Sequence, residues 1–213
     1  MSPSRTVRFW SITAAVVLFS RLAHRGILWA DEDYHLAAAI QLLRGKMLYR
    51  DVWYDKPPLN ALIDLVFGGW HGWPLRVACT LAVLGVCWLG YKLAEKLWGP
   101  NEGLVAAALL AFFQIFYLPA AIMPLEPDTL LLLPELAAVY LAVTERPFAA
   151  GLSAGTALLL SPKGVFVLLP CFVFLGPSGW PALLAGFALP NAAAIAWLWA
   201  TGALSDYLSL IHI

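Results

Sequence analysis

Seven apolar segments separated by short polar or helix-breaking stretches dominate this chain and limit the folds open to it. They cover residues 7–23, 74–97, 104–122, 129–143, 148–160, 165–175 and 181–201. A bilayer core of about 30 Å takes about 20 apolar residues per helix, and fewer where the helix ends snorkel to the interface. Hydrophobic residues make up 62% of the chain and charged residues only 12%, which excludes an ordinary soluble domain. The sequence therefore predicts an all-α polytopic membrane protein with about seven transmembrane helices.

The polar residues exclude several functions. The formal net charge is zero and the basic residues form no stripe, so we expect no nucleic-acid partner. Cys79, Cys87 and Cys171 lie in apolar runs and indicate neither a zinc site nor a disulfide framework. The four histidines lack metal-ligand spacing. His35 is near enough to the acidic cluster to join a site, but we expect a surface imidazole there.

The N-terminus predicts a retained membrane helix. Arg5 and Arg8 precede an apolar run, as in a signal peptide, but Arg21 and Arg25 follow where a small-residue cleavage site would stand.

Charged residues gather in the loop after this first helix. Ten of the 26 Asp, Glu, Lys and Arg residues fall between Arg25 and Lys56. Asp31 can cap a helix with a helical repeat of apolar residues that ends at Gly45, and the apolar stretch 59–70 is too short to span a membrane. We therefore predict two interfacial helices within this loop, and a working site beside them.

The order of the polar motifs resembles that of GT-C glycosyltransferases. The nearest resemblance is to the dolichyl-phosphate-mannose protein mannosyltransferase-like branch, which includes bacterial aminoarabinose transferases. The motifs that carry it are Asp31-Glu32-Asp33-Tyr34, Leu43-Arg44-Gly45, Tyr49-Arg50-Asp51, Lys56-Pro57-Pro58-Leu59, Pro124-Leu125-Glu126-Pro127-Asp128 and Ser161-Pro162-Lys163-Gly164. This resemblance covers nearly the whole chain and is most specific in the first loop.

The resemblance implies transfer of a sugar, with inversion, from a polyprenyl-phosphate-linked donor to a hydroxyl of a protein, lipid or glycan. Asp31 matches the family's catalytic base, and Glu32 would orient Asp31 or the acceptor. Lys56 and Lys163 would contact the donor phosphate, because a leaving phosphate needs cations or hydrogen-bond donors. Glu126 and Asp128 would hold the acceptor or a divalent cation such as Mg²⁺, Mn²⁺, Ca²⁺ or Zn²⁺. Possible substrate contacts are Tyr34, Arg50 and Tyr54.

Structural roles are open for the same residues. The acids at Asp31, Glu126 and Asp128 could only cap helices. Lys56 could snorkel to the interface, and Lys163 could be structural. Glu135 follows Pro134 inside an apolar segment and fits a kinked helix with a locally paired carboxylate. The tryptophans near segment ends indicate interface anchors, with Trp53 and Tyr54 as exceptions worth testing.

The resemblance also sets expectations for organisation and location. Residues 1–213 would form one GT-C-like transmembrane domain, an N-terminal portion of the family pattern, with the loop 24–73 outside the cytoplasm. Basic residues on the two sides are balanced, so orientation rests on the resemblance. We expect a bacterial inner or plasma membrane protein whose partners are the bilayer, a polyprenyl-phosphate sugar and an acceptor. Alternatives are a transporter or lipid flippase, or a non-catalytic subunit.

Overall fold

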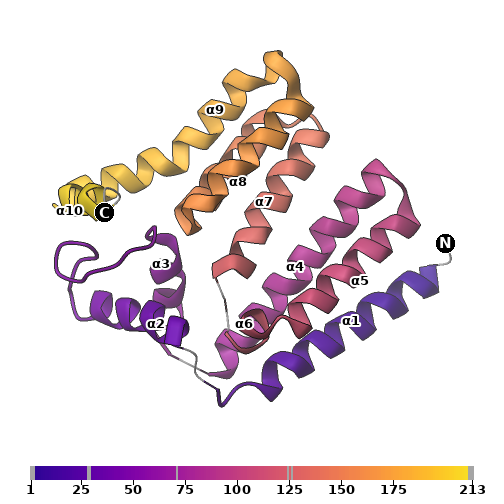
Figure 1. The fold of residues 1–213 in the computed structure, drawn as a ribbon, viewed down its shortest axis with the longest axis horizontal. Helices are drawn as coiled ribbons and strands as arrows, with labels where there is room; N and C mark the ends of the chain where they lie inside the picture. The colour runs from indigo at the N-terminus through magenta and orange to yellow at the C-terminus, as the bar shows by residue number, and fades with distance from the viewer. Residues whose placement is uncertain (1–2, 28–29, 71, 124, 126, 211–213) are drawn as a thin grey trace.

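A computed structural model describes residues 3–27, 30–70, 72–123, 125 and 127–210, and it describes the backbone alone at residues 3, 30–32 and 210. The described residues form helices and connecting segments without a strand, which confirms the predicted all-α fold (Figure 1). In chain order the helices are α1 (Pro3–Ala23), α2 (Ala30–Leu43), α3 (Leu59–Val66), α4 (Trp73–Leu97), α5 (Pro100–Phe116), α6 (Leu118–Ile122), α7 (Pro127–Val143), α8 (Pro147–Leu160), the 3₁₀ helix η1 (Pro162–Val167), α9 (Leu168–Ala200) and α10 (Leu204–Leu210).

Three helical stretches of the described chain are long and apolar enough to cross a membrane. They are Ser4–Ala23, Trp73–Leu97 and Pro162–Ala200, while α5 and α8 are shorter apolar helices. The longest stretch is broken at Gly176, where φ is 62° and ψ is 177°. Such a left-handed φ suits glycine. The chain reverses there, in the gap between the predicted segments 165–175 and 181–201.

The predicted segment 104–122 is not one helix. α5 ends at Phe116, Tyr117 is extended with φ −75° and ψ 112°, and the short α6 follows. Pro119 has no N–H to donate to a carbonyl one turn earlier, so it fits the first turn of a new helix better than the interior of a long one.

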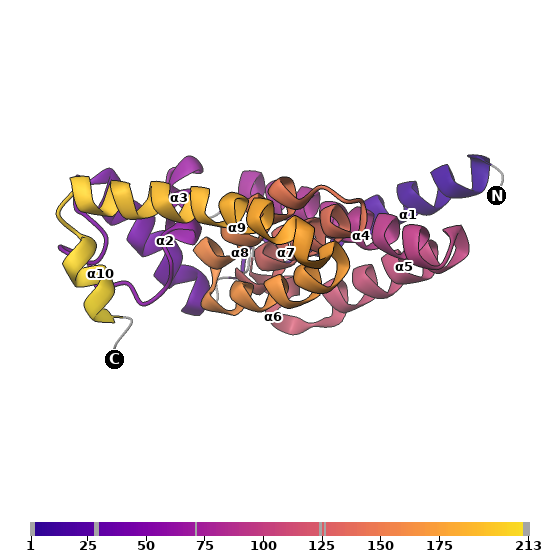
Figure 2. The same ribbon diagram turned by 90° about the horizontal axis from the view of Figure 1, so that it is seen from above.

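The helices form two groups of packed neighbours in one thin layer (Figures 1 and 2). One group packs α1 against α4 and α4 against α5, and the other packs α7, α8 and α9 together, with α4 and α7 joining the groups. Gly151, Gly155 and Gly186 let α8 lie tightly against the part of α9 that follows Gly176. A Cβ at any of the three would meet backbone atoms of the other helix.

The charged loop forms the two predicted helices at one end of this layer, together with α10 and opposite the N-terminus (Figure 1). α2 begins at Ala30, which places Asp31 inside its first turn rather than before it, and Gly45 follows the helix with φ 78°. The side chain of Asn60 in α3 donates to the carbonyl oxygen of Leu160 at the end of α8, 2.8 Å away. This bond ties the loop to the helix bundle.

Two fully buried arginines brace the chain between α5 and α7. Arg21, near the end of α1, donates to the carbonyl oxygens of Ala120 and, at 2.9 Å, Gln114. Arg76, in the first turn of α4, donates to the carbonyl oxygens of Ile122 and, at 3.0 Å, Ile27. A buried guanidinium needs hydrogen-bond acceptors, and the carbonyl oxygens of Ala120 and Ile122 connect α6 to α1 and α4 in this way.

Candidate functional site

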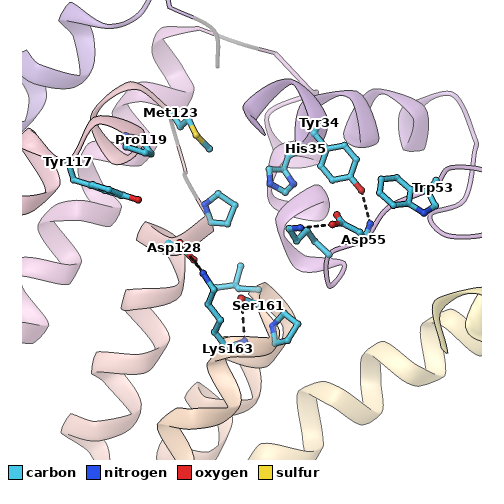
Figure 3. Close-up of a pocket in the computed structure, with 14 residues that line it drawn as sticks. Tyr34, His35, Trp53, Asp55, Tyr117, Pro119, Met123, Asp128, Ser161 and Lys163 are labelled. Carbon is cyan, nitrogen blue, oxygen red and sulfur yellow. Dashed lines mark hydrogen bonds and ion pairs between the residues drawn. The ribbon is translucent and has the colours of Figure 1, made fainter. Parts of the chain in front are cut away.

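A cavity of about 690 Å³ opens at the end of the bundle where the charged loop lies (Figure 3). Its walls come from α2 and the segment before α3, from α6 and the start of α7, and from the junction of α8 with η1. The lining residues are Tyr34, His35, Trp53, Asp55, Lys56, Tyr117, Pro119, Met123, Pro127, Asp128, Leu160, Ser161, Pro162 and Lys163. Tyr34, Lys56, Asp128 and Lys163 are therefore brought together from distant parts of the chain, as the predicted site requires.

The Ser161-Pro162-Lys163-Gly164 motif forms a polar turn on one wall. Ser161 is extended, and its hydroxyl accepts a hydrogen bond from the backbone N–H of Lys163 at the start of η1. Lys163 Nζ then lies 3.1 Å from Asp128 Oδ1 and 3.3 Å from Oδ2 in the first turn of α7 (Figure 3). The Lys163 and Asp128 side chains are 69% and 51% exposed, so both can also reach a ligand in the cavity.

The opposite wall carries a second lysine beside a carboxylate. Lys56 Nζ lies 2.6 Å from Asp55 Oδ2, and the backbone N–H of Asp55 donates to the Tyr34 hydroxyl at 2.7 Å. Burial raises the pKa of Asp55, but the hydrogen bonds from Lys56 and Tyr34 outweigh it and hold that pKa below its ordinary value. Burial also raises the pKa of Tyr34 to about 12. At neutral pH this wall presents an ammonium, a carboxylate and a phenol.

Tyr54 supports this wall from behind and does not line the cavity. Its ring stacks on that of Tyr34 with 5.1 Å between centroids, and its hydroxyl lies 2.8 Å from His35 Nδ1. Tyr54 is fully buried, which raises its pKa, and His35 is only 6% exposed. The expectation of a surface imidazole at His35 is wrong, because the first loop folds back over α2 and covers the inner face of that helix.

Arg50 lies outside the cavity lining and holds two parts of the chain together. Its guanidinium donates to Asp51 at 2.9 Å and to the carbonyl oxygen of Thr201, just after α9, also at 2.9 Å. The Arg50 hydrogen bond lowers the pKa of Asp51 to about 2. The neighbouring Tyr49 ring packs edge-on against Tyr207 of α10, with 4.8 Å between centroids. A substrate contact by Arg50 stays a prediction, as do direct contacts by Tyr34 and Tyr54.

Three predicted site side chains fall outside the described part of the structure. Asp31 and Glu32 have a described backbone in the first turn of α2, without side-chain detail, and Glu126 lies outside the described residues. Their roles as base, supporting carboxylate and ligand stay predictions.

The predicted divalent cation at Glu126 and Asp128 stays a prediction, because Glu126 lies outside the described residues. Among them no three His, Cys, Asp or Glu side chains are grouped closely enough to hold one. The two described carboxylates that line the cavity, Asp55 and Asp128, are each in contact with a lysine ammonium, which disfavours a second cation at the same oxygens.

Sequence analysis missed several cavity residues. Asp55 was predictable from the sequence, since it directly precedes the Lys56-Pro57-Pro58-Leu59 motif. Tyr117 and Met123 were not predictable from the sequence, because they reach the cavity wall only through the break between α5 and α6. Arg21 and Arg76 hold that break in place through contacts between residues distant in sequence.

Comparison with known proteins identifies the family. Comparison with curated proteins and with solved structures gives no match. The sequence model of the dolichyl-phosphate-mannose-protein mannosyltransferase family matches residues 55–204. The match is shorter than the expected whole-chain resemblance: it includes Lys56, Glu126, Asp128 and Lys163, whereas Asp31 and Glu32 precede it. With most of its length matched and an all-helical architecture rich in apolar helices, this integral membrane chain belongs to the dolichyl-phosphate-mannose-protein mannosyltransferase family, a family of membrane glycosyltransferases.

Proposed function

We propose that this protein transfers a sugar from a polyprenyl-phosphate donor to an acceptor hydroxyl, with inversion, in the cavity beside its first loop. One observation carries the proposal. Lys56, Asp128 and Lys163 lie far apart within the matched region, yet all three line the same cavity. A cavity with two ammonium groups suits a phosphate that gains negative charge as its bond to the sugar breaks.

The two lysines are held in place before any ligand arrives. Lys56 contacts Asp55 and Lys163 contacts Asp128, so each ammonium is oriented at the cavity wall before the donor binds. A donor phosphate would compete with the carboxylates for these cations. Preorganised charge of this kind lowers the barrier because little reorganisation remains to be done in the transition state.

Inversion requires the acceptor to attack from the face opposite the leaving group. The acceptor oxygen forms a bond to the anomeric carbon as that carbon's bond to the phosphate oxygen breaks. Asp31, near the start of α2, would take the hydroxyl proton, Glu32 would orient it, and polyprenyl phosphate would leave. Asp128 with Glu126 would hold the acceptor or a divalent cation.

The proposed base is tested by Asp31→Asn, with Asp33→Asn as a matched control. Asp33 lies in the same helical turn and its side chain is exposed. Loss of a general base lowers the rate by roughly 10²-fold or more, so Asp31→Asn should lose transfer activity while Asp33→Asn keeps it. Normal turnover by a folded Asp31→Asn variant would remove Asp31 from the mechanism.

The reaction itself is tested by mass spectrometry of lipids and glycans from cells with and without the intact gene. We expect one lipid, protein or glycan class to lose a sugar mass without the gene, while the lipid-linked donor accumulates. Substrate uptake into vesicles with no change in any lipid-linked sugar would contradict the proposal and favour a transporter. If the purified chain binds polyprenyl phosphate without turnover, it acts as a non-catalytic subunit instead. Labelling of single cysteines placed in the loop 24–73 with a membrane-impermeant reagent tests its proposed position outside the cytoplasm.

A further inference from the structure

Trp53 differs from the other exposed tryptophans of the described chain, because it lines this cavity. It is 65% exposed and lines the cavity near Asp55 (Figure 3). Trp70 is 79% exposed but lies after α3, outside the cavity lining. An interface anchor does not need to line a cavity that also holds charged side chains, so the position of Trp53 calls for another explanation.

The Trp53 ring belongs to a supported aromatic wall. Its centroid lies 6.0 Å from that of Tyr34, with the two planes tilted by 57°. Tyr34 is in turn stacked on the buried Tyr54 and accepts the backbone N–H of Asp55. Three contacts therefore hold the wall, while Trp53 itself stays 65% exposed.

The chemistry of this wall matches a sugar ring. A pyranose has an apolar face of C–H groups and an edge of hydroxyls, so an indole face can cover the first while a carboxylate accepts hydrogen bonds from the second. Asp55 supplies that carboxylate, and Lys56 follows directly in the chain. Because the donor sugar is bonded directly to its phosphate, a lysine on the phosphate places the ring within reach of the adjacent wall.

We propose that Trp53, with Tyr34 and Asp55, binds the sugar ring of the lipid-linked donor. This inference rests on the proposed function and adds a consequence to it. The aromatic wall distinguishes the sugar-linked donor from the product polyprenyl phosphate, which lacks the sugar ring. The donor then binds more tightly than the product, and the site empties after transfer.

Binding of matched lipids to the purified full chain tests the wall. The probes are dolichyl phosphate mannose, dolichyl phosphate glucose and bare dolichyl phosphate. Wild type should bind at least one glycosylated lipid about tenfold more tightly than the bare one, the size of a good aromatic contact. Trp53→Ala should lose that preference and keep its affinity for bare dolichyl phosphate. Trp53→Phe should recover part of the preference, and Trp70→Ala should behave as wild type.

The other outcomes separate the wall from the proposed function. If Trp53→Ala keeps the preference, or weakens all three lipids equally, Trp53 does not bind the sugar while the transferase proposal stands. If the wild-type chain binds all three lipids equally, the aromatic wall does not bind the donor sugar, and the transferase proposal again stands. If no lipid binds and no transfer occurs, both proposals fail.

Discussion

Lys163 Nζ lies 3.1 Å from Asp128 Oδ1, although the two residues are 35 positions apart. The contact joins η1 to the start of α7 on one wall of the cavity. Exposed pairs of this kind contribute little to stability, because water screens the attraction and ordering two flexible side chains costs entropy. We therefore expect the Lys163–Asp128 pair, which lines the cavity, to matter more for binding than for folding.

Replacing Lys163 with Ala should separate function from stability. We expect the free energy of unfolding to change by about 0–1 kcal/mol, as for other exposed ion pairs. Transfer from a lipid-linked donor should fall by at least about tenfold, since a charge-assisted contact to the leaving phosphate is lost. Lys46→Ala removes an exposed lysine from the charged loop and serves as the control. Equal activity of the two variants would exclude Lys163 from the site.

Arg21→Met should destabilise the protein strongly. The variant loses two buried donors, which satisfy the carbonyl oxygens of Ala120 and Gln114. Hydrogen bonds to a charged group are worth roughly 1.5–3 kcal/mol each, so the thermal unfolding midpoint in detergent should drop clearly. Arg25→Met, at an exposed site a few residues later, should leave that midpoint unchanged. A midpoint that stays the same in both variants would show that the buried bonds do not support α6.

Tyr207→Ala should loosen residues 47–56 of the first loop, which include the Tyr49 partner of Tyr207. Tyr207 packs edge-on against Tyr49, and such aromatic pairs contribute about 0.5–1.5 kcal/mol beyond the area they bury. We expect faster amide hydrogen exchange at residues 47–56 and weaker donor binding. The neighbouring Leu208 is 47% exposed, so Leu208→Ala should exchange like wild type. Unchanged exchange in Tyr207→Ala would mean that α10 does not hold the loop.

Alkaline titration should show the burial of Tyr34. Its pKa is raised from 10.0 to about 12, so the folded state keeps a proton that the unfolded chain loses. The contribution of Tyr34 to stability is therefore fully present below about pH 10 and is lost as the pH rises to about 12. The phenolate absorbance of wild type minus that of Tyr34→Phe should rise near pH 12. A midpoint at or below pH 10 would contradict the burial.

Local patterns predicted much of the helical layout. Gly45 and Gly176 mark real helix ends because glycine adopts a positive φ at low cost. The charged loop folds into α2 and α3, as its apolar spacing indicates. The break at Tyr117 was missed, since one proline in an apolar run can lie inside a helix or at the start of the next one. The contacts made by Arg21 and Arg76 favour a new helix start at Pro119.

The sequence alone was enough to predict the class of the protein, the main helical segments, the family, and Lys56, Asp128 and Lys163, which line the cavity. These features depend on composition and on short-range spacing, which the chain carries locally. The three-dimensional packing was needed to show that Lys163 contacts Asp128, that Asp55 and Trp53 line the cavity, and that His35 is buried. Such contacts depend on how distant helices pack, and that packing is a collective result of burial and hydrogen-bond satisfaction.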